Sequence, residues 1–168
     1  MSETLNDWRR DYEDEAPLLE QDLATDPIAQ FDRWLQEASQ AELIEPNAMT
    51  LATTAADGTP DARIVLLKEF DADGFVFYTN YQSAKAAQLR DNPLATLVFY
   101  WDKLGRTVRI TGMVTKVARE MSEQYFATRP RKSQIGAWVS DQSQPIADRD
   151  TLRARFEALA EQYEGQDV

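Results

Sequence analysis

Three short segments in the middle of the chain carry cationic side chains, and two of them add hydroxyl groups; both kinds of group bind phosphate through hydrogen bonds. They are Arg63–Lys68, Ser83–Lys85 and Tyr125–Ser133. Residues 61–140 hold 12 Lys and Arg against 8 Asp and Glu, whereas the other 88 residues hold 6 against 21. This confined positive charge favours a small anionic ligand in a pocket. Nucleic acid would need a broad positive face, and the acidic remainder of the chain argues against one.

In the first segment, Arg63 and Lys68 stand at the two ends of the apolar run Ile64–Leu67. A separation of five residues puts the two cations on opposite faces of a regular strand. An uninterrupted apolar run is typical of a strand that is covered on both sides. The two cations are either solvent-facing ends of the strand or anchors that reach a ligand, and the segment by itself leaves both open.

In the second segment, Ser83 precedes a predicted helix and Lys85 lies in its first turn. Unpaired N–H groups, a hydroxyl and an ammonium at a helix start suit a phosphate. A plain N-cap beside a solvated lysine is the alternative, and it is the commoner case for a single capped helix.

In the third segment, Tyr125, Arg129 and Ser133 follow one another at intervals of four. One continuous helix would place them on one face, but Pro130 argues against such a helix. We therefore expect the three side chains to converge across a bend, where they would form a phosphate cage. The alternative is a surface cluster at a helix end.

The 168-residue chain has no histidine and no cysteine. Catalysis by Ser-His-Asp or Cys-His groups, disulfides and a structural zinc site are therefore excluded. Any chemistry must use Lys, Arg, Tyr, Ser and carboxylates, or come from a bound cofactor. From the polar, acidic N-terminus we expect no secretory signal, and no stretch has the roughly 20 apolar residues of a membrane span. We expect a cytoplasmic protein without a membrane or nucleic-acid partner.

The pattern of elements predicts one domain over residues 26–168 after a flexible N-terminal arm over residues 1–25. Asp26 and Pro27 are a helix start, with a capping carboxylate followed by proline at the first helical position. Apolar residues at helical spacing extend this helix to about residues 43–45.

Short strands joined by tight turns follow, with helices mostly at the ends of the chain. This order predicts the α+β class, with an antiparallel sheet closed into a small barrel. The expected strands are 49–54, 62–70, 75–80, 94–101 and 107–117, and the expected further helices are 84–90, 120–128, 133–140 and a last one capped by Asp148 or Asp150.

In this order, the motifs closely resemble those of the pyridoxine/pyridoxamine 5′-phosphate oxidases, from about Trp8 to the last residue. The first carrying motifs are Arg-Ile-Val-Leu-Leu-Lys, Gly-Phe-Val-Phe-Tyr-Thr-Asn and Ser-Ala-Lys-Ala. The longest is Tyr-Phe-Ala-Thr-Arg-Pro-Arg-Lys-Ser-Gln-Ile-Gly-Ala-Trp-Val-Ser. The motifs occupy residues 63–68, 74–80, 83–86, 92–101, 125–140 and 142–143.

The resemblance implies an antiparallel split β-barrel of the FMN-binding type with peripheral helices. It also implies a homodimer that holds FMN between its subunits. Arg63 and Lys85 would lie near the FMN phosphate. The full implied set of FMN contacts is Arg63, Ile64, Val65, Leu66, Leu67, Lys68, Tyr78, Thr79, Lys85, Gln142 and Ser143.

The implied substrates are pyridoxamine 5′-phosphate and pyridoxine 5′-phosphate. By resemblance, a hydride passes from the substrate to FMN, and O2 is the final acceptor and gives H2O2. The flavin carries the chemistry, so no catalytic side chain is implied. The implied substrate contacts are Lys68, Tyr125, Arg129 and Ser133, together with Arg9 and Tyr12 from an N-terminal segment.

The chain also departs from the family pattern. Ala84 stands where the family usually has Arg, and Thr107 where it usually has Gln; both are flavin contacts. The family continues with a Trp-Gly-Gly strand and an Arg-Leu-His segment, and nothing in residues 161–168 matches these. We therefore expect either a fragment of a longer family member or a shortened relative with impaired catalysis. Two alternatives stay open: a flavin-binding split barrel without turnover, and a non-catalytic module that binds pyridoxal phosphate or phosphate.

Overall fold

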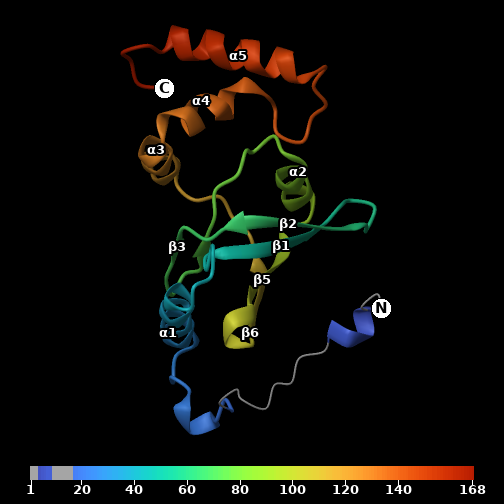
Figure 1. Cartoon of the computed structure of the whole chain (residues 1–168), viewed down its shortest axis with the longest axis vertical. Helices are drawn as coiled ribbons and strands as arrows, with labels where there is room; N and C mark the ends of the chain where they lie inside the picture. The colour runs from blue at the N-terminus through green and yellow to red at the C-terminus, as the bar shows by residue number, and fades with distance from the viewer. Residues whose placement is uncertain (1–3, 9–16) are drawn as a thin grey trace.

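The computed structural model describes residues 4–8 and 17–168 (Figure 1). The predicted substrate contacts Arg9 and Tyr12 therefore lie outside the described residues, as does much of the predicted arm. The described strands are β1 Ala48–Thr54, β2 Pro60–Leu66, β3 Glu69–Phe70, β4 Phe75–Val76, β5 Leu94–Trp101 and β6 Arg106–Met113. The α-helices are α1 Pro27–Gln40, α2 Ala84–Asp91, α3 Arg119–Thr128, α4 Arg131–Val139 and α5 Arg149–Gln162.

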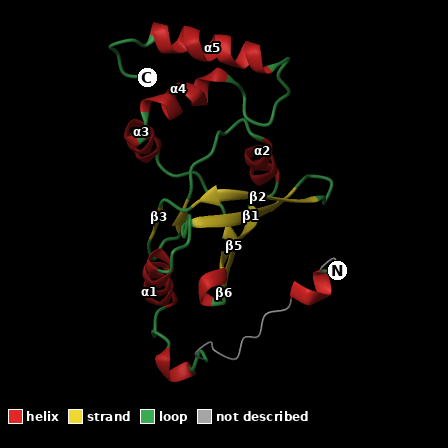
Figure 2. Ribbon diagram, in the orientation of Figure 1, coloured by secondary structure: helices red, strands yellow, loops and turns green. Residues whose placement is uncertain are grey.

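Strands and helices together confirm the α+β class (Figure 2). Four strands form an antiparallel sheet in the order β2-β1-β5-β6, and β3 pairs with β4 in a separate two-stranded ribbon. α3, α4 and α5 lie together at the end of the molecule away from α1 (Figure 1). None of the helices in the described part of the chain is long and apolar enough to cross a membrane.

The first helix, α1, joins the ribbon to the sheet. It begins where the sequence predicts, since the Asp26 carboxylate accepts a hydrogen bond from the Ala29 N–H at 2.9 Å. One turn later, Phe31 packs edge-on against Phe70 and Phe75 of the ribbon, with ring centroids 5.0 and 4.9 Å away. The ring of Phe99 on β5 lies 5.1 Å from it on the sheet side.

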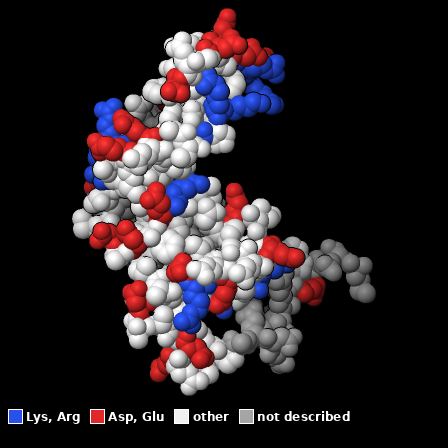
Figure 3. Space-filling model, turned by 90° about the vertical axis from the view of Figure 1, so that its left-hand side faces the viewer, with Lys and Arg blue, Asp and Glu red and all other residues white. Residues whose placement is uncertain are grey.

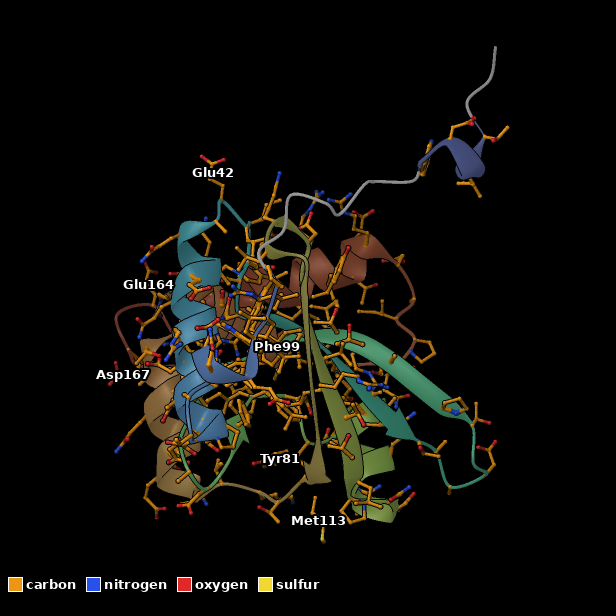
Figure 4. All side chains as sticks on the ribbon, turned by 90° about the horizontal axis from the view of Figure 1, so that it is seen from below. Glu42, Tyr81, Phe99, Met113, Glu164 and Asp167 are labelled. Carbon is orange, nitrogen blue, oxygen red and sulfur yellow. The ribbon has the colours of Figure 1, made fainter. Side chains whose placement is uncertain are left out.

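The core lies between α1 and the inner face of the sheet. β1 alternates buried and half-buried positions, as expected for a strand with one face on the core. Phe99 lies among the enclosed side chains, whereas Met113 lies at the periphery (Figure 4). The buried apolar residues of this core are Phe31, Ala38, Met49, Leu51, Leu67, Ala95, Leu97, Phe99 and Trp101.

Four predicted boundaries are wrong by three or more residues. One is the end of strand β6, which lies at Met113 instead of residue 117. The strand expected over 62–70 breaks after Leu66, because Leu67 exchanges two hydrogen bonds with Asn47 instead of continuing the ladder. Strand β4 ends at Val76, well short of residue 80. Helix α1 ends at Gln40, and Glu42 beyond it has a left-handed φ of 54° that no helix tolerates.

Candidate functional site

Three predicted FMN contacts from distant parts of the chain meet at the start of α2. The Lys85 ammonium donates to the Gln142 side-chain oxygen at 2.8 Å, and the Thr79 hydroxyl donates to the same oxygen at 3.3 Å. The Ser83 hydroxyl lies 3.5 Å from that of Thr79. Ser83 is fully buried and caps α2 by accepting from the Ala86 N–H, which fixes the direction in which the helix starts. An ammonium and a hydroxyl thus converge on one acceptor oxygen.

Arg63 lies beside this network but is held by its own neighbours. Its Nη1 donates to the Leu51 carbonyl at 3.2 Å and to the Thr53 hydroxyl at 2.6 Å. Its Nη2 donates to the Gln88 side-chain oxygen at 3.0 Å and lies 2.5 Å from Asp61 Oδ2. The antiparallel register places Arg63 opposite Leu51, so its side chain extends along the inner side of the sheet towards α2.

The two cations affect each other. Partial burial is the main cause that lowers the pKa of Lys85, and the positive charge of Arg63 lowers it further. The Asp61 carboxylate acts in the opposite direction and raises the pKa of Lys85. Lys85, Arg63 and Asp61 therefore form one electrostatic cluster at the start of α2.

A second group of predicted site residues gathers around Tyr125 on α3. The rings of Tyr78 and Tyr125 are stacked in parallel, with centroids 3.8 Å apart. Lys68 Nζ lies 5.8 Å from the centre of the Tyr125 ring, within the range of a cation–π contact. Burial raises the pKa of the Tyr78 phenol, and the nearby Glu69 carboxylate raises it further, so this phenol stays protonated at neutral pH.

Members of both groups line a cleft of about 1370 Å³, although the three cations Arg63, Lys68 and Lys85 are not among its lining residues. Arg129 ends α3 in an extended conformation and Pro130 precedes α4, so the chain bends here as the sequence predicts. The bend brings Tyr125 and Ser133, which lie on different helices, to the same cleft. The predicted site residues that line it are Tyr78, Thr79, Tyr125, Arg129, Ser133 and Gln142.

The apolar run between the cations is divided between two environments. Leu67 is only 4% exposed and Val65 packs against the core, so their side chains are committed to packing. Ile64 is 63% exposed, which corrects the expectation of a run covered on both sides. Leu66 is half-buried, and Ser143 is exposed with a φ of 70°. Any ligand contact from Val65 or Leu67 would have to use the backbone.

Sequence reasoning missed the residues that hold Arg63: Asp61, Thr53 and Gln88. For two of them, the sequence spacing to a predicted site residue could have indicated the contact. Asp61 precedes Arg63 by two residues, which places both on one face of a strand. Gln88 follows Lys85 by three, which places both on one side of a helix. Thr53 had no such signal, because it reaches Arg63 only through strand pairing.

The donors present fit a phosphate-bearing cofactor. A partly buried ammonium, a guanidinium and two hydroxyls lie within one cluster, and a wide cleft with stacked tyrosines adjoins it. Among the described residues, no group of three or more His, Cys, Asp or Glu side chains could hold a metal ion. Basic and acidic side chains are interspersed on the face that Figure 3 shows.

A protein-family model described as pyridoxamine 5′-phosphate oxidase matches residues 35–163. The chain belongs to this family. It is 54% identical over 165 residues to a pyridoxine/pyridoxamine 5′-phosphate oxidase of Acaryochloris marina, covering 98% of this chain and 75% of that protein. It is 56% identical over 160 residues to the enzyme of the same name from Burkholderia multivorans, covering 95% and 74%.

Solved structures confirm the split-barrel fold of this oxidase family. PhzG from Burkholderia lata 383, in complex with tetrahydrophenazine-1-carboxylic acid, has a TM-score of 0.84 and 27% identity and covers 92% of this chain and 76% of its own. A pyridoxamine 5′-phosphate oxidase-related, FMN binding protein from Nostoc punctiforme has a TM-score of 0.61 and 18% identity, with coverages of 78% and 73%. The second likeness supports the fold alone.

Proposed function

We propose that this chain is an FMN-dependent oxidase that converts pyridoxamine 5′-phosphate and pyridoxine 5′-phosphate to pyridoxal 5′-phosphate, within vitamin B6 biosynthesis and salvage. Family membership supports an oxidoreductase, with FMN as its cofactor. One observation supports the specific reaction most: two separate groups of candidate phosphate ligands both contribute to the lining of one cleft, with Thr79 and Gln142 from the first group and Tyr125, Arg129 and Ser133 from the second. A reaction between two phosphate-bearing molecules needs two such groups.

The first group would hold FMN. Lys85 and Thr79 supply an ammonium and a hydroxyl, each within hydrogen-bond distance of the Gln142 side-chain oxygen. Arg63 adds positive charge beside them. When bound, FMN supplies a two-electron acceptor that O2 reoxidises with release of H2O2. The residues of this chain bind and orient the reactants, which is how a protein assists cofactor chemistry.

The second group would hold the substrate. Lys68, Arg129 and Ser133 present an ammonium, a guanidinium fork and a hydroxyl, which suit the substrate phosphate. Tyr125 adds a phenol, and its ring is already fixed by stacking on Tyr78. Since the Tyr78 phenol stays protonated, it adds no negative charge near an anionic substrate.

We further propose that the chain acts as a homodimer in the cytoplasm. The outer face of the sheet carries Ile64, Leu94 and Tyr100, which are 63%, 55% and 70% exposed. Exposed apolar side chains of this size are typical of a contact surface. A second copy that covers this face would also enclose the start of the segment Ile64–Lys68.

The purified protein tests the proposal directly. We expect a yellow protein with flavin absorption that releases H2O2 when pyridoxamine 5′-phosphate is added in air. A protein that takes up no added FMN would refute the flavin function altogether. Bound FMN without H2O2 release would support the alternative of a flavin-binding protein without turnover, which the loss of two family contacts at Ala84 and Thr107 favours.

A further inference from the structure

The guanidinium of Arg63 is almost fully committed to protein acceptors. Its side chain is 18% exposed, and both Nη atoms are engaged by Leu51, Thr53, Gln88 and Asp61. Among the described residues, the Nε–H group is the donor left for a further acceptor. Arg63 thus lacks the free fork that makes arginine a bidentate phosphate ligand.

Asp61 is the charged member of that set. Its Oδ2 lies 2.5 Å from Arg63 Nη2 and accepts from Gln88 Nε2 at 3.0 Å. The Gln88 amide therefore bridges the pair, because its oxygen accepts from Arg63 while its nitrogen donates to Asp61. The Gln88 hydrogen bond is the main cause that lowers the pKa of Asp61, so this carboxyl is ionised at neutral pH.

The charges of the cluster can be added up. Arg63 and Lys85 contribute two positive charges and Asp61 one negative charge, so the cluster carries a net charge of +1. A phosphate monoester carries about −1.5 to −2 at neutral pH. Asp61 therefore offsets half of the positive charge available to such a group.

We propose that Asp61 is a positioning residue that weakens phosphate binding, because it holds the Arg63 fork and neutralises its charge, leaving Lys85 as the cation of the cluster that has no ion pair among the described residues. This inference rests on the proposed binding of FMN. Asp61 thereby sets the affinity for the phosphorylated flavin while leaving the affinity for the flavin ring unchanged. Gln88 serves the same purpose by keeping the pair together.

The variant Asp61→Asn tests the proposal, because it removes the charge and keeps the side-chain shape. Flavin fluorescence quenching gives the dissociation constants of FMN and of riboflavin, which has the same ring system but no phosphate. We expect Asp61→Asn to bind FMN about three- to tenfold more tightly, because the variant lacks a negative charge that repels the FMN phosphate. The affinity for riboflavin should not change. Asp61→Glu keeps the negative charge, so its affinity for FMN should equal that of the wild type.

A matched control is Glu157→Gln, which removes the same charge from an exposed position of α5. It should leave both dissociation constants unchanged. If Asp61→Asn bound FMN equally or more weakly, or if it changed riboflavin binding to the same extent, the inference would be wrong. These results all presuppose that the wild-type protein binds FMN. Failure of the wild-type protein to bind FMN would refute the proposed function and the inference together.

Discussion

Identical charges have different roles at Arg63 and Lys85 because their neighbours differ. Arg63 is surrounded by four acceptors, one of them a carboxylate at 2.5 Å. Lys85 donates to one neutral amide oxygen, which a phosphate oxygen could replace. The lysine is thus the residue on which the proposed FMN affinity depends most, although the motif in the sequence presents the two cations as equals.

The pH dependence of FMN binding should reflect Lys85. Burial lowers the pKa of its ammonium below the ordinary value of 10.5, and the protonated form binds phosphate. FMN affinity is therefore complete below this lowered pKa and falls as the pH rises through it. In Lys85→Arg, whose guanidinium stays charged, the fall should move to higher pH. Titration of FMN at several pH values tests this, with riboflavin as the control for ionisation of the ring.

The midpoint of that fall is the decisive quantity. An unchanged midpoint in Lys85→Arg, after correction for riboflavin, would assign the pH dependence to another group.

The guanidinium of Arg129 should contribute to binding of the substrate and not to binding of FMN. Arg129 lines the cleft at the bend between α3 and α4, away from the start of α2. Arg129→Ala should raise the KM for pyridoxamine 5′-phosphate by about 10- to 100-fold, since a charge-assisted hydrogen bond is lost. Its flavin content should match that of the wild type, and steady-state H2O2 release measures the KM.

The exposed neighbour Lys132 provides the control for Arg129. Lys132→Ala removes a cation from α4 at a position that does not line the cleft, so its KM should equal that of the wild type. Loss of flavin in Arg129→Ala would mean that the cations are divided wrongly between the two phosphates.

At the scale of elements, the bend at Arg129 and Pro130 assembles the second group. An unbroken helix would carry Tyr125 and Ser133 on one side of a rod. The break starts a second helix instead, which packs on α5, and Arg131 donates to backbone carbonyls of Tyr163 and Gln166 beyond α5. Both helices then face one cleft.

The Asp26 side chain should stabilise the whole of helix α1 by capping its first turn. The Asp26 carboxylate accepts from the Ala29 N–H at 2.9 Å, and the helix behind it carries Phe31 into the core. Asp26→Ala should lower the free energy of unfolding by about 1 kcal/mol. Urea denaturation followed by circular dichroism measures this change.

Asp32 on the same helix is the comparison for that cap. Asp32 is exposed and, among the described residues, its side chain bonds only to that of Gln36, so Asp32→Ala should change the unfolding free energy by less than about 0.5 kcal/mol. If both variants lost the same free energy of unfolding, the capping hydrogen bond would not be the cause of the loss in Asp26→Ala.

At the scale of the whole molecule, the outer face of the sheet is the proposed contact surface between two copies of the chain. Ile64 on β2 should contribute to a contact between two copies, as its 63% exposure beside the proposed FMN segment suggests. Ile64→Glu should shift the protein from dimer to monomer and weaken FMN binding. Sedimentation velocity measures the mass, and flavin content measures the second effect.

Ile44 offers a matched control, since it is 99% exposed and lies in the connection between α1 and β1. Ile44→Glu should leave both mass and flavin content unchanged. A wild-type protein that sediments as a monomer would refute the proposed dimer.

Much of the fold was predictable because its signals are local. Asp26 and Pro27 predict the start of α1 and Ser83 that of α2, since capping depends on residues within one turn. For α5 the sequence left Asp148 and Asp150 as possible caps, and the structure shows Asp148 in that role. The end of the strand at Leu66 was not predictable, because the bonds that replace the ladder come from Asn47, 20 residues away.

The sequence by itself determined the family and the bend at Pro130, and it supplied the two proposed sets of phosphate ligands, because residue types, their order and local backbone restrictions are properties of the chain itself. The tertiary structure decided which of these residues have free donors. Strand pairing and the position of α2 bring Thr53, Gln88 and Asp61 around Arg63. Within the described part of the chain, they leave Lys85 with one neutral acceptor, the Gln142 side-chain oxygen. The charge that a ligand meets depends on distances between side chains, and only the folded chain sets those distances.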